Sequence, residues 1–237
     1  MADKGVLYGV GVGPGDPGLM TLKAVETIKR CPVVAAPRTP NGGMVALDIA
    51  RGAVDFADKL VLPLDFAMSR DAGVRAASHR AATALVREHL DQGTDVALLN
   101  LGDVSIYASF QYIATLLDGK GYRLEMIPGV PSFCAAAALL GTGLTEMGTT
   151  LRIIPEAETV KDEALRASGT SIWMKSGKNL PNLLARLAAC GLSDKAILVQ
   201  NCGMANQRVI RDVAATEVGS DYFSLVIVKN DGEEAAP

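Results

Sequence analysis

Three glycine-rich turns carry the residue types and spacings in this chain that could do chemistry. The first runs from Gly9 to Pro17, as Gly-Val-Gly-Val-Gly-Pro-Gly-Asp-Pro, between a predicted strand and a predicted helix. It does not fit the dinucleotide-binding pattern Gly-x-Gly-x-x-Gly, because Pro14 or Asp16 stands where the third glycine is needed. The prolines and Asp16 also remove or neutralise backbone N–H groups that a phosphate would need. By itself, this segment predicts a tight strand-to-helix turn.

The second turn, Leu101 to Tyr107, follows the continuous apolar run Val96 to Leu99, which is typical of a strand covered on both faces. Ligands of open α/β sheets bind outside the carboxyl ends of such strands. The carboxylate of Asp103 could accept hydrogen bonds from an amine or a ribose, or it could cap the helix that follows. This turn alone leaves both interpretations open.

The third turn, Ile127 to Ser132, joins a strand to a helix through two prolines and a glycine. Ser132 could bond to a ligand or cap its own helix, and the position by itself favours the cap.

Strands and helices alternate around these turns. Apolar runs predict strands at Val6–Val12, Val33–Ala36, Leu60–Leu62, Val96–Leu99, Leu124–Ile127, Leu151–Ile154, Ser171–Met174, Ala196–Gln200, Arg208–Ala214 and Ser224–Val228. Helical spacing predicts helices around Leu22–Ile28, Gly43–Ala50, Ala72–Leu90, Tyr107–Leu117, Pro131–Leu140 and Leu180–Ala189.

This order predicts an α/β fold with two α/β domains. The first half alternates strand and helix, so its sheet should be mainly parallel. The second half ends in neighbouring strands, so its sheet should be mixed. We expect one domain at residues 1–119, a second at 120–230, and a disordered tail at 231–237.

Composition excludes several classes of protein. The chain is 49% apolar, which is typical of a globular core, and its net charge of −3 does not favour nucleic-acid binding. No apolar run reaches the roughly 20 residues of a membrane span, and the start lacks the apolar core of a signal peptide, so we expect a cytoplasmic protein. His79 and His89 lie about 15 Å apart in one predicted helix, and the four cysteines form no Cys-x-x-Cys pair. We therefore expect no metal site and no histidine-dependent triad.

In their order and spacing, the three turns together resemble the tetrapyrrole (uroporphyrinogen III and precorrin) methylase family. The resemblance extends through Leu19–Ala24, after the first turn, to Ser224–Val228 near the end of the chain. Within the family, Val104 replaces a common proline, and this feature and Asn201–Met204 resemble the branch that methylates C20 of precorrin-2 or its cobalt-bearing counterpart, cobalt-factor II.

The resemblance implies S-adenosylmethionine bound in a folded form between two α/β domains, and a homodimer. It implies cofactor contacts at Leu101, Gly102, Asp103, Ile106, Ser132, Phe133, Met174, Cys202, Gly203, Ser224 and Leu225. Pro14 and its turn would lie at the substrate end of the site. Without the family, Met174 would be interpreted as a core residue at a strand end.

A tetrapyrrole substrate carries several carboxylates, so its site needs cations. Basic residues near predicted loops at strand ends are Arg38, Arg70, Arg75, Arg152 and Lys175. Each is individually more typical of a solvated surface charge, and our hypothesis is that at least two bind substrate carboxylates.

Methyl transfer needs alignment rather than an activated nucleophile, so we assign no catalytic residue. The alternatives are a methylase for another corrin carbon, for uroporphyrinogen III, for diphthamide or for ribosomal RNA. A different class of alternative is a tetrapyrrole- or nucleotide-binding protein that is not an enzyme.

Overall fold

The computed structural model describes residues 3–155, 161–216, 218–219 and 221–230. The predicted disordered tail, residues 231–237, lies outside the described residues. Two compact units divide the chain, Met1–Pro131 and Ser132–Pro237. In the part of the chain that is described, no helix is both long and apolar enough to cross a bilayer.

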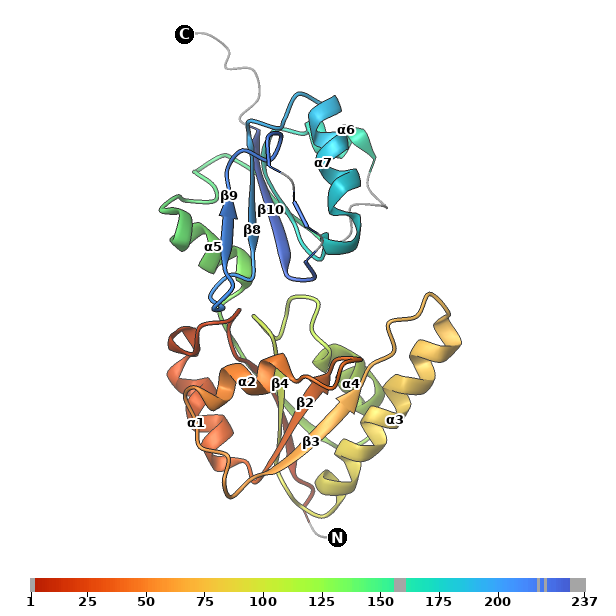
Figure 1. Ribbon diagram of the computed structural model, residues 1–237. Coiled ribbons are helices and arrows are strands. Elements are labelled where there is room, and N and C mark those ends of the chain that lie inside the picture. Colours follow the sequence, from red (N-terminus) through yellow and green to blue (C-terminus); the bar gives the residue numbers. More distant parts are fainter. Residues whose placement is uncertain (1–2, 156–160, 217, 220, 231–237) are drawn as a thin grey trace. The chain divides into compact units, whose positions relative to one another are not determined.

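The first unit is a parallel sheet with a helix after most strands (Figure 1). Its strands are β1 (Val6–Gly11), β2 (Val33–Arg38), β3 (Leu60–Asp65), β4 (Val96–Asn100) and β5 (Arg123–Ile127). Its α-helices are α1 (Leu22–Arg30), α2 (Val45–Arg51), α3 (Ala72–Asp91) and α4 (Phe110–Leu117). The strand order is β3-β2-β4-β1-β5, and every neighbouring pair is parallel, as predicted.

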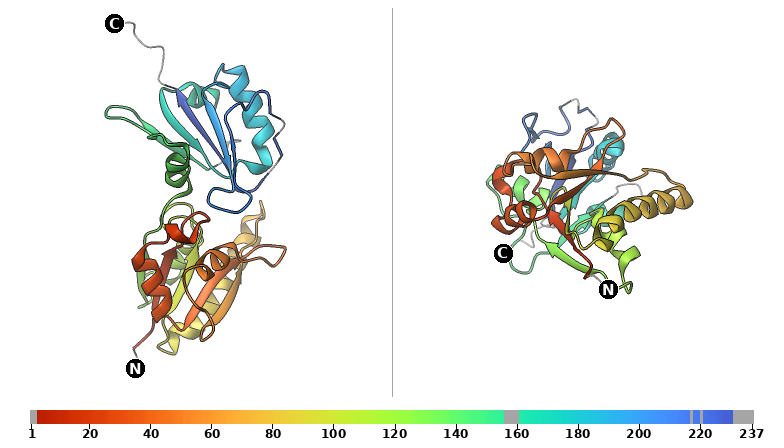
Figure 2. Two further views of the ribbon diagram at one scale, coloured as in Figure 1. Left: turned by 60° about the vertical axis from the view of Figure 1, so that its left-hand side comes forward. Right: turned by 90° about the horizontal axis from the view of Figure 1, so that it is seen from below.

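Helices cover both faces of this sheet (Figures 1 and 2). Alternate residues of β4 point to opposite faces, because side chains alternate along a strand. Ala97 and Leu99 pack in the cluster that holds residues of α1 and α2. Val96 and Leu98 pack with residues of α3 and α4. A strand buried on both faces must be apolar throughout, and this explains the continuous run in the sequence.

Helix α4 begins at Phe110, later than the predicted start at Tyr107. The backbone N–H of Phe110 donates to the side-chain oxygen of Asn100, 3.0 Å away, at the end of β4. Tyr107 has a φ of 49°, which no right-handed helix can contain. The segment between β4 and α4 is therefore a loop that the end of β4 holds in place.

The second unit is also a covered sheet. Its strands are β6 (Leu151–Ile154), β7 (Gly169–Trp173), β8 (Ala196–Gln200), β9 (Arg208–Ile210) and β10 (Ser224–Asn230). Its α-helices are α5 (Ser132–Leu140), α6 (Asp162–Arg166) and α7 (Leu180–Ala189). Strands β6 and β7 are parallel, and the other neighbours in the order β6-β7-β10-β8-β9 are antiparallel. The predicted mixed sheet is confirmed. Helix α6 was not predicted, and β9 ends at Ile210 rather than at the predicted Ala214.

The junction between the two units lies after Pro131, whereas the sequence predicted a boundary between residues 119 and 120. Strand β5 pairs with β1 along its whole length, from Val6 opposite Arg123 to Val10 opposite Ile127. It therefore belongs to the first sheet, and the chain divides after Pro131. The glycine-rich turn at 118–121 connects two elements of one unit.

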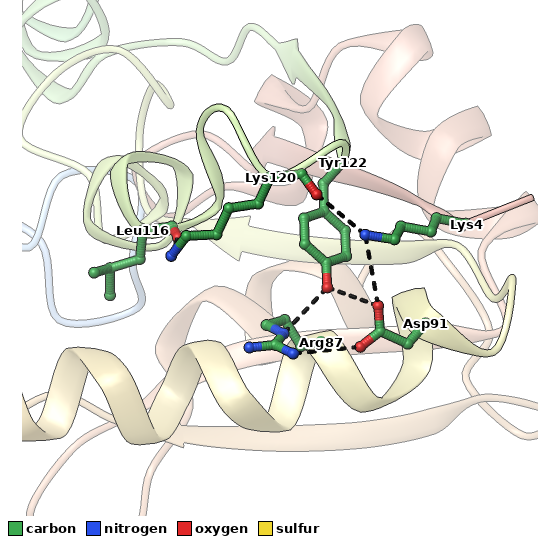
Figure 3. Close-up of polar contacts among 6 residues, drawn as sticks. All are labelled: Lys4, Arg87, Asp91, Leu116, Lys120 and Tyr122. Carbon is green, nitrogen blue, oxygen red and sulfur yellow. Dashed lines mark hydrogen bonds and ion pairs between the residues drawn. The ribbon is translucent and has the colours of Figure 1, made fainter.

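Charged side chains hold together the amino edge of the first sheet, where its parallel strands begin (Figure 3). The Nζ of Lys4 lies 3.7 Å from the centre of the Tyr122 ring and donates to the carbonyl of Lys120, 3.1 Å away. The Tyr122 hydroxyl donates to Asp91 (2.6 Å) and accepts from Arg87 Nε (3.1 Å). These side chains join the segment before β1 to the end of α3 and the start of β5.

Candidate functional site

The three glycine-rich turns meet at the opposite, carboxyl edge of the first sheet. They follow β1, β4 and β5, which are neighbours in the sheet with β1 in the centre. Gly13 and Gly102 exchange two backbone hydrogen bonds, of 3.2 and 2.8 Å. The N–H of Val12 donates to the carbonyl of Asn100, 3.0 Å away. The first and second turns are thus bonded to each other.

The backbones of these turns pack directly against one another. A Cβ atom added to Gly11 would lie 2.7 Å from both the Gly102 carbonyl oxygen and the Gly129 nitrogen. A Cβ added to Gly129 would overlap the same Gly102 oxygen. Gly102 itself has a φ of 71°, which favours glycine. Glycine at these positions therefore lets the backbones of the turns approach one another closely.

Asp103 joins the second turn to the third. Its Oδ2 accepts from the Gly129 N–H, 2.8 Å away, and its Oδ1 accepts from the Ser105 N–H, 2.8 Å away, and from the Ser105 hydroxyl. Only 9% of the residue is exposed. Burial alone would raise the pKa of Asp103, but the hydrogen bonds from Ser105, Gly129 and Val104 outweigh it and lower the pKa below 3.8. The carboxylate is therefore ionised at neutral pH.

These contacts decide one of the alternatives that the sequence left open. Asp103 does not cap α4, because the first N–H of that helix donates to Asn100. Both oxygens of its carboxylate bind within the turns instead. Of its neighbours, Val104 is buried in the cluster that holds residues of α3 and α4, and Leu101 packs against the opposite cluster.

The basic residues predicted in the first unit have different surroundings. Arg38 and Asp65 end β2 and β3 and form a two-point ion pair, with N–O distances of 2.9 and 2.6 Å. Both side chains are exposed, by 41% and 67%, and the hydrogen bond from Arg38 lowers the pKa of Asp65. Arg75 donates to the carbonyls of Ser69 and Arg70, at 2.7 and 2.8 Å, so it holds the loop after β3. Arg70 is exposed in that loop.

In the second unit, most of the predicted cofactor residues gather at one edge of the sheet. Met174 follows β7, Cys202 and Gly203 follow β8, and Ser224 and Leu225 begin β10. Because β10 is antiparallel to β7 and β8, its first residues lie beside the ends of those strands, with Ser224 opposite Gln200. Residues that are far apart in the sequence therefore meet here.

A buried polar network that the sequence did not predict supports this edge. The Asn201 side chain donates to Asp221 Oδ2, 2.6 Å away. The Ser224 hydroxyl donates to the Asp221 carbonyl (2.7 Å) and accepts from Gln200 (2.9 Å). Gln200, Asn201 and Ser224 are each less than 5% exposed. One signal was present: asparagine next to the end of a strand tolerates the left-handed conformation that Asn201 adopts, with φ 51°.

The remaining predicted residues of the second unit lie in three places. Ser132 and Phe133 begin α5, and Phe133 is buried. Lys175, after Met174, is exposed. Arg152 lies within β6 and donates to the carbonyls of Ala167 and Ser168, just before β7 begins. Its guanidinium therefore faces the edge opposite Met174.

Backbone strain marks the same edges. Among the described residues, three that are not glycine have a left-handed φ: Tyr107 at 49°, Lys175 at 54° and Asn201 at 51°. Each lies in a turn after a strand, β4, β7 or β8 respectively. Such conformations cost free energy and cluster at functional sites.

The sequence profile of the family described as Tetrapyrrole (Corrin/Porphyrin) Methylases matches residues 6–216 of this chain. The cobalamin biosynthesis protein CobIJ of Mycobacterium tuberculosis is 32% identical over 96% of the chain, which spans only 46% of that relative. The chain therefore has about half the length of this relative. Precorrin-2 C(20)-methyltransferase of Sinorhizobium is 31% identical over 94% of the chain and 95% of its own length.

Solved structures share the fold. A cobalt precorrin-4 methyltransferase superposes with a TM-score of 0.72 at 20% identity and covers 94% of both chains. A uroporphyrin-III C-methyl transferase from Thermus thermophilus, complexed with S-adenyl homocysteine, has a TM-score of 0.68 at 22% identity, with 95% of this chain and 97% of that one covered.

Proposed function

Because this chain belongs to the tetrapyrrole methylase family, we propose that it transfers a methyl group from S-adenosylmethionine to C20 of precorrin-2 or cobalt-precorrin-2 in cobalamin biosynthesis. The single observation that carries the choice of C20 is the similarity, over nearly the full length of both chains, to a precorrin-2 C(20)-methyltransferase. Val104 and Asn201–Met204, the two stretches that resemble the C20 branch, favour the same choice.

Both edges offer groups that suit this cofactor. We propose contacts in the first unit at Leu101, Gly102, Asp103 and Ile106, and in the second at Ser132, Phe133, Met174, Cys202, Gly203, Ser224 and Leu225. A methyl donor must be kept away from competing nucleophiles. Burial raises the pKa of the Cys202 thiol, so it stays protonated at neutral pH and is a poor nucleophile. The proposed contact residues are therefore compatible with a cofactor that carries a reactive sulfonium.

The bound cofactor supplies the methyl group and its leaving group, so the protein's task is alignment. Orientation of two reactants can contribute about 7–11 kcal/mol. The bonded turns after β1, β4 and β5 provide fixed backbone for that purpose, since Gly13, Gly102 and Gly129 are held by hydrogen bonds. The proton at C20 must leave after transfer, and the acetate and propionate arms of the substrate are candidate acceptors.

For the substrate, we propose that Arg38, Arg70 and Lys175 bind carboxylates and that Pro14 lies at the substrate end of the site. An exposed ion pair is weak in water, so Arg38 can exchange Asp65 for a substrate carboxylate. Arg75 and Arg152 already donate to backbone carbonyls, and we expect their replacement to affect stability more than substrate affinity.

The test is incubation with S-adenosylmethionine carrying a ¹³C-methyl group and, in separate reactions, with precorrin-2, with precorrin-2 and cobalt, and with uroporphyrinogen III, followed by NMR of the product. We expect one new methyl at C20. A methyl at another carbon, or transfer only to uroporphyrinogen III, would assign another methylase of the family, and binding without transfer would assign a binding protein. We also propose that the protein is cytoplasmic and forms a homodimer. Light scattering of the purified protein tests the homodimer.

A further inference from the structure

Asp103 is a buried carboxylate whose described hydrogen bonds all lie within the turns. We infer that, besides the cofactor contact proposed at this residue, the Asp103 carboxylate has a positioning role: it fixes the third turn on the second and thereby sets the backbone geometry of the carboxyl edge. This inference rests on the proposed function, because it is through cofactor binding at this edge that the positioning matters.

The third turn is held by a hydrogen bond and by close backbone packing. The Gly129 N–H donates to Asp103 Oδ2, 2.8 Å away. The backbones of Gly11 and Gly102 lie so close to Gly129 that no Cβ fits there. The packing limits how closely Gly129 can approach these two residues, and the bond to Asp103 keeps it beside the second turn. The position of the segment that leads into α5 is thereby fixed.

The second turn is fixed by the same carboxylate. The N–H and the hydroxyl of Ser105 both donate to Oδ1. One ionised group thus satisfies donors from two turns that are 26 residues apart along the chain. Hydrogen bonds to a charged acceptor are stronger than those between neutral groups, so this arrangement depends on the negative charge.

An asparagine at this position has nearly the same shape but cannot satisfy these donors. Its amide has one oxygen acceptor, and its NH₂ group would face the N–H of either Ser105 or Gly129. A donor left without an acceptor in a buried place is costly. We therefore expect D103N to keep the fold and to loosen one turn from the other.

The same sheet provides a matched control. Asp95, just before β4, accepts the N–H of Val6 at 2.8 Å. It therefore makes the same kind of bond as Asp103, from carboxylate to distant backbone, but at the amino edge. D95N replaces this charged acceptor by a neutral amide oxygen, which can still accept from Val6, and so weakens a comparable interaction in the same unit at the edge away from the turns. Stability should fall in both variants, and cofactor affinity should fall in only one.

The experiment compares wild type, D103N, S105A and D95N by thermal unfolding and by calorimetric titration with S-adenosylhomocysteine. We expect D103N to weaken binding about tenfold or more, a change of about 1.4 kcal/mol. S105A keeps the bond to Gly129 and should weaken binding less, and D95N should leave the Kd within about twofold of wild type. A purely structural role predicts equal Kd values for D103N and D95N, and that result would overturn the inference.

The outcomes separate this inference from the proposed function. If wild type does not bind S-adenosylhomocysteine, the proposed function fails and the inference fails with it. If wild type binds and D103N binds equally well, only the inference fails. Should D103N not fold, hydrogen exchange at the Gly129 amide of unliganded wild type decides: slow exchange supports the inference, and exchange at the rate of an open loop overturns it.

Discussion

The two edges of the first sheet differ in how far exposed side chains contribute to holding them together. At the amino edge, long charged side chains join the elements, and all of them are partly exposed (Figure 3): Lys4 by 38%, Arg87 by 50% and Asp91 by 43%. At the carboxyl edge, backbone packs on backbone and one buried carboxylate, Asp103, completes the assembly. Exposed ion pairs contribute little to stability, and their side chains can change conformation. Buried contacts between backbones permit only one geometry. Only the second arrangement can hold a ligand in a fixed orientation.

The edges also differ in what they tolerate. The exposed charged side chains at the amino edge, Lys4, Arg87 and Asp91, can be exchanged or shortened, because water replaces any partner that is lost. At the carboxyl edge, neither an added methyl group nor a lost charge can be accommodated without moving a turn. Measurements of stability together with cofactor affinity therefore distinguish the edges, since changes at the amino edge should leave affinity unaffected.

The largest effect should come from an added methyl group at the carboxyl edge. In G129A, the new Cβ would overlap the carbonyl oxygen of Gly102. We expect a loss of about 3 kcal/mol in the free energy of unfolding, as for severe overpacking, together with loss of S-adenosylhomocysteine binding. Urea denaturation and calorimetry measure the two quantities.

Gly119 at the amino edge is the control for G129A. Its φ is 68° and nothing lies within 4 Å of an added Cβ. G119A should cost only the left-handed penalty of about 1–2 kcal/mol and leave cofactor affinity unchanged. Equal loss of affinity in both variants would contradict the contrast between the edges.

The second unit sharpens the comparison, because its edge is fixed by side chains that are buried. N201A removes the bond to Asp221 and places alanine at a φ of 51°. We expect a loss of about 2 kcal/mol and weaker cofactor binding. N201G removes the same bond without the conformational penalty, so it should be the more stable of the two while binding equally weakly. If N201G binds as wild type does, the Asn201 side chain has no part in the site.

A smaller change in stability, but a clear change in activity, is expected at Tyr107. This residue is 45% exposed at the carboxyl edge and has a φ of 49°. Y107G removes the left-handed strain while adding unfolded-state entropy, and these two backbone changes, each about 1 kcal/mol, should nearly cancel, so that any change in stability reports the contacts of the lost side chain. Strain that is retained at such an edge indicates that the side chain is needed, so we expect methyl transfer to fall with little change in Tm. Full activity in Y107G would show that the strain has no functional cause.

The sequence predicted most of the fold because the apolar runs and glycine turns are local signals. The strand Ala196–Gln200 and the helix Leu180–Ala189 agree with the structure to the residue. The pairing of β5 with β1, which places β5 in the first sheet, is a long-range choice that no local pattern reveals. In the site, glycine and strand-end positions identified the turns, but the bond between Asp103 and Gly129 and the network around Asp221 depend on tertiary placement.

The smallest effect is expected from Y122F at the amino edge. It removes the hydroxyl that donates to Asp91 and accepts from Arg87, and it keeps the ring beneath Lys4.

The hydrogen bond from Tyr122 is the main reason that the pKa of Asp91 is lowered from 3.8, with smaller contributions from Arg87 and Lys4. A carboxylate with a lowered folded-state pKa stabilises the fold above its unfolded pKa, and this stabilisation is lost as the pH falls from about 3.8 through the folded value. Y122F should therefore lose slightly less stability than wild type on acidification below about pH 4. Unfolding curves at a series of pH values measure this difference, and high salt should reduce it because the groups are exposed. Cofactor affinity should not change, and a change in Kd comparable to that of G129A would mean that the two edges are not independent.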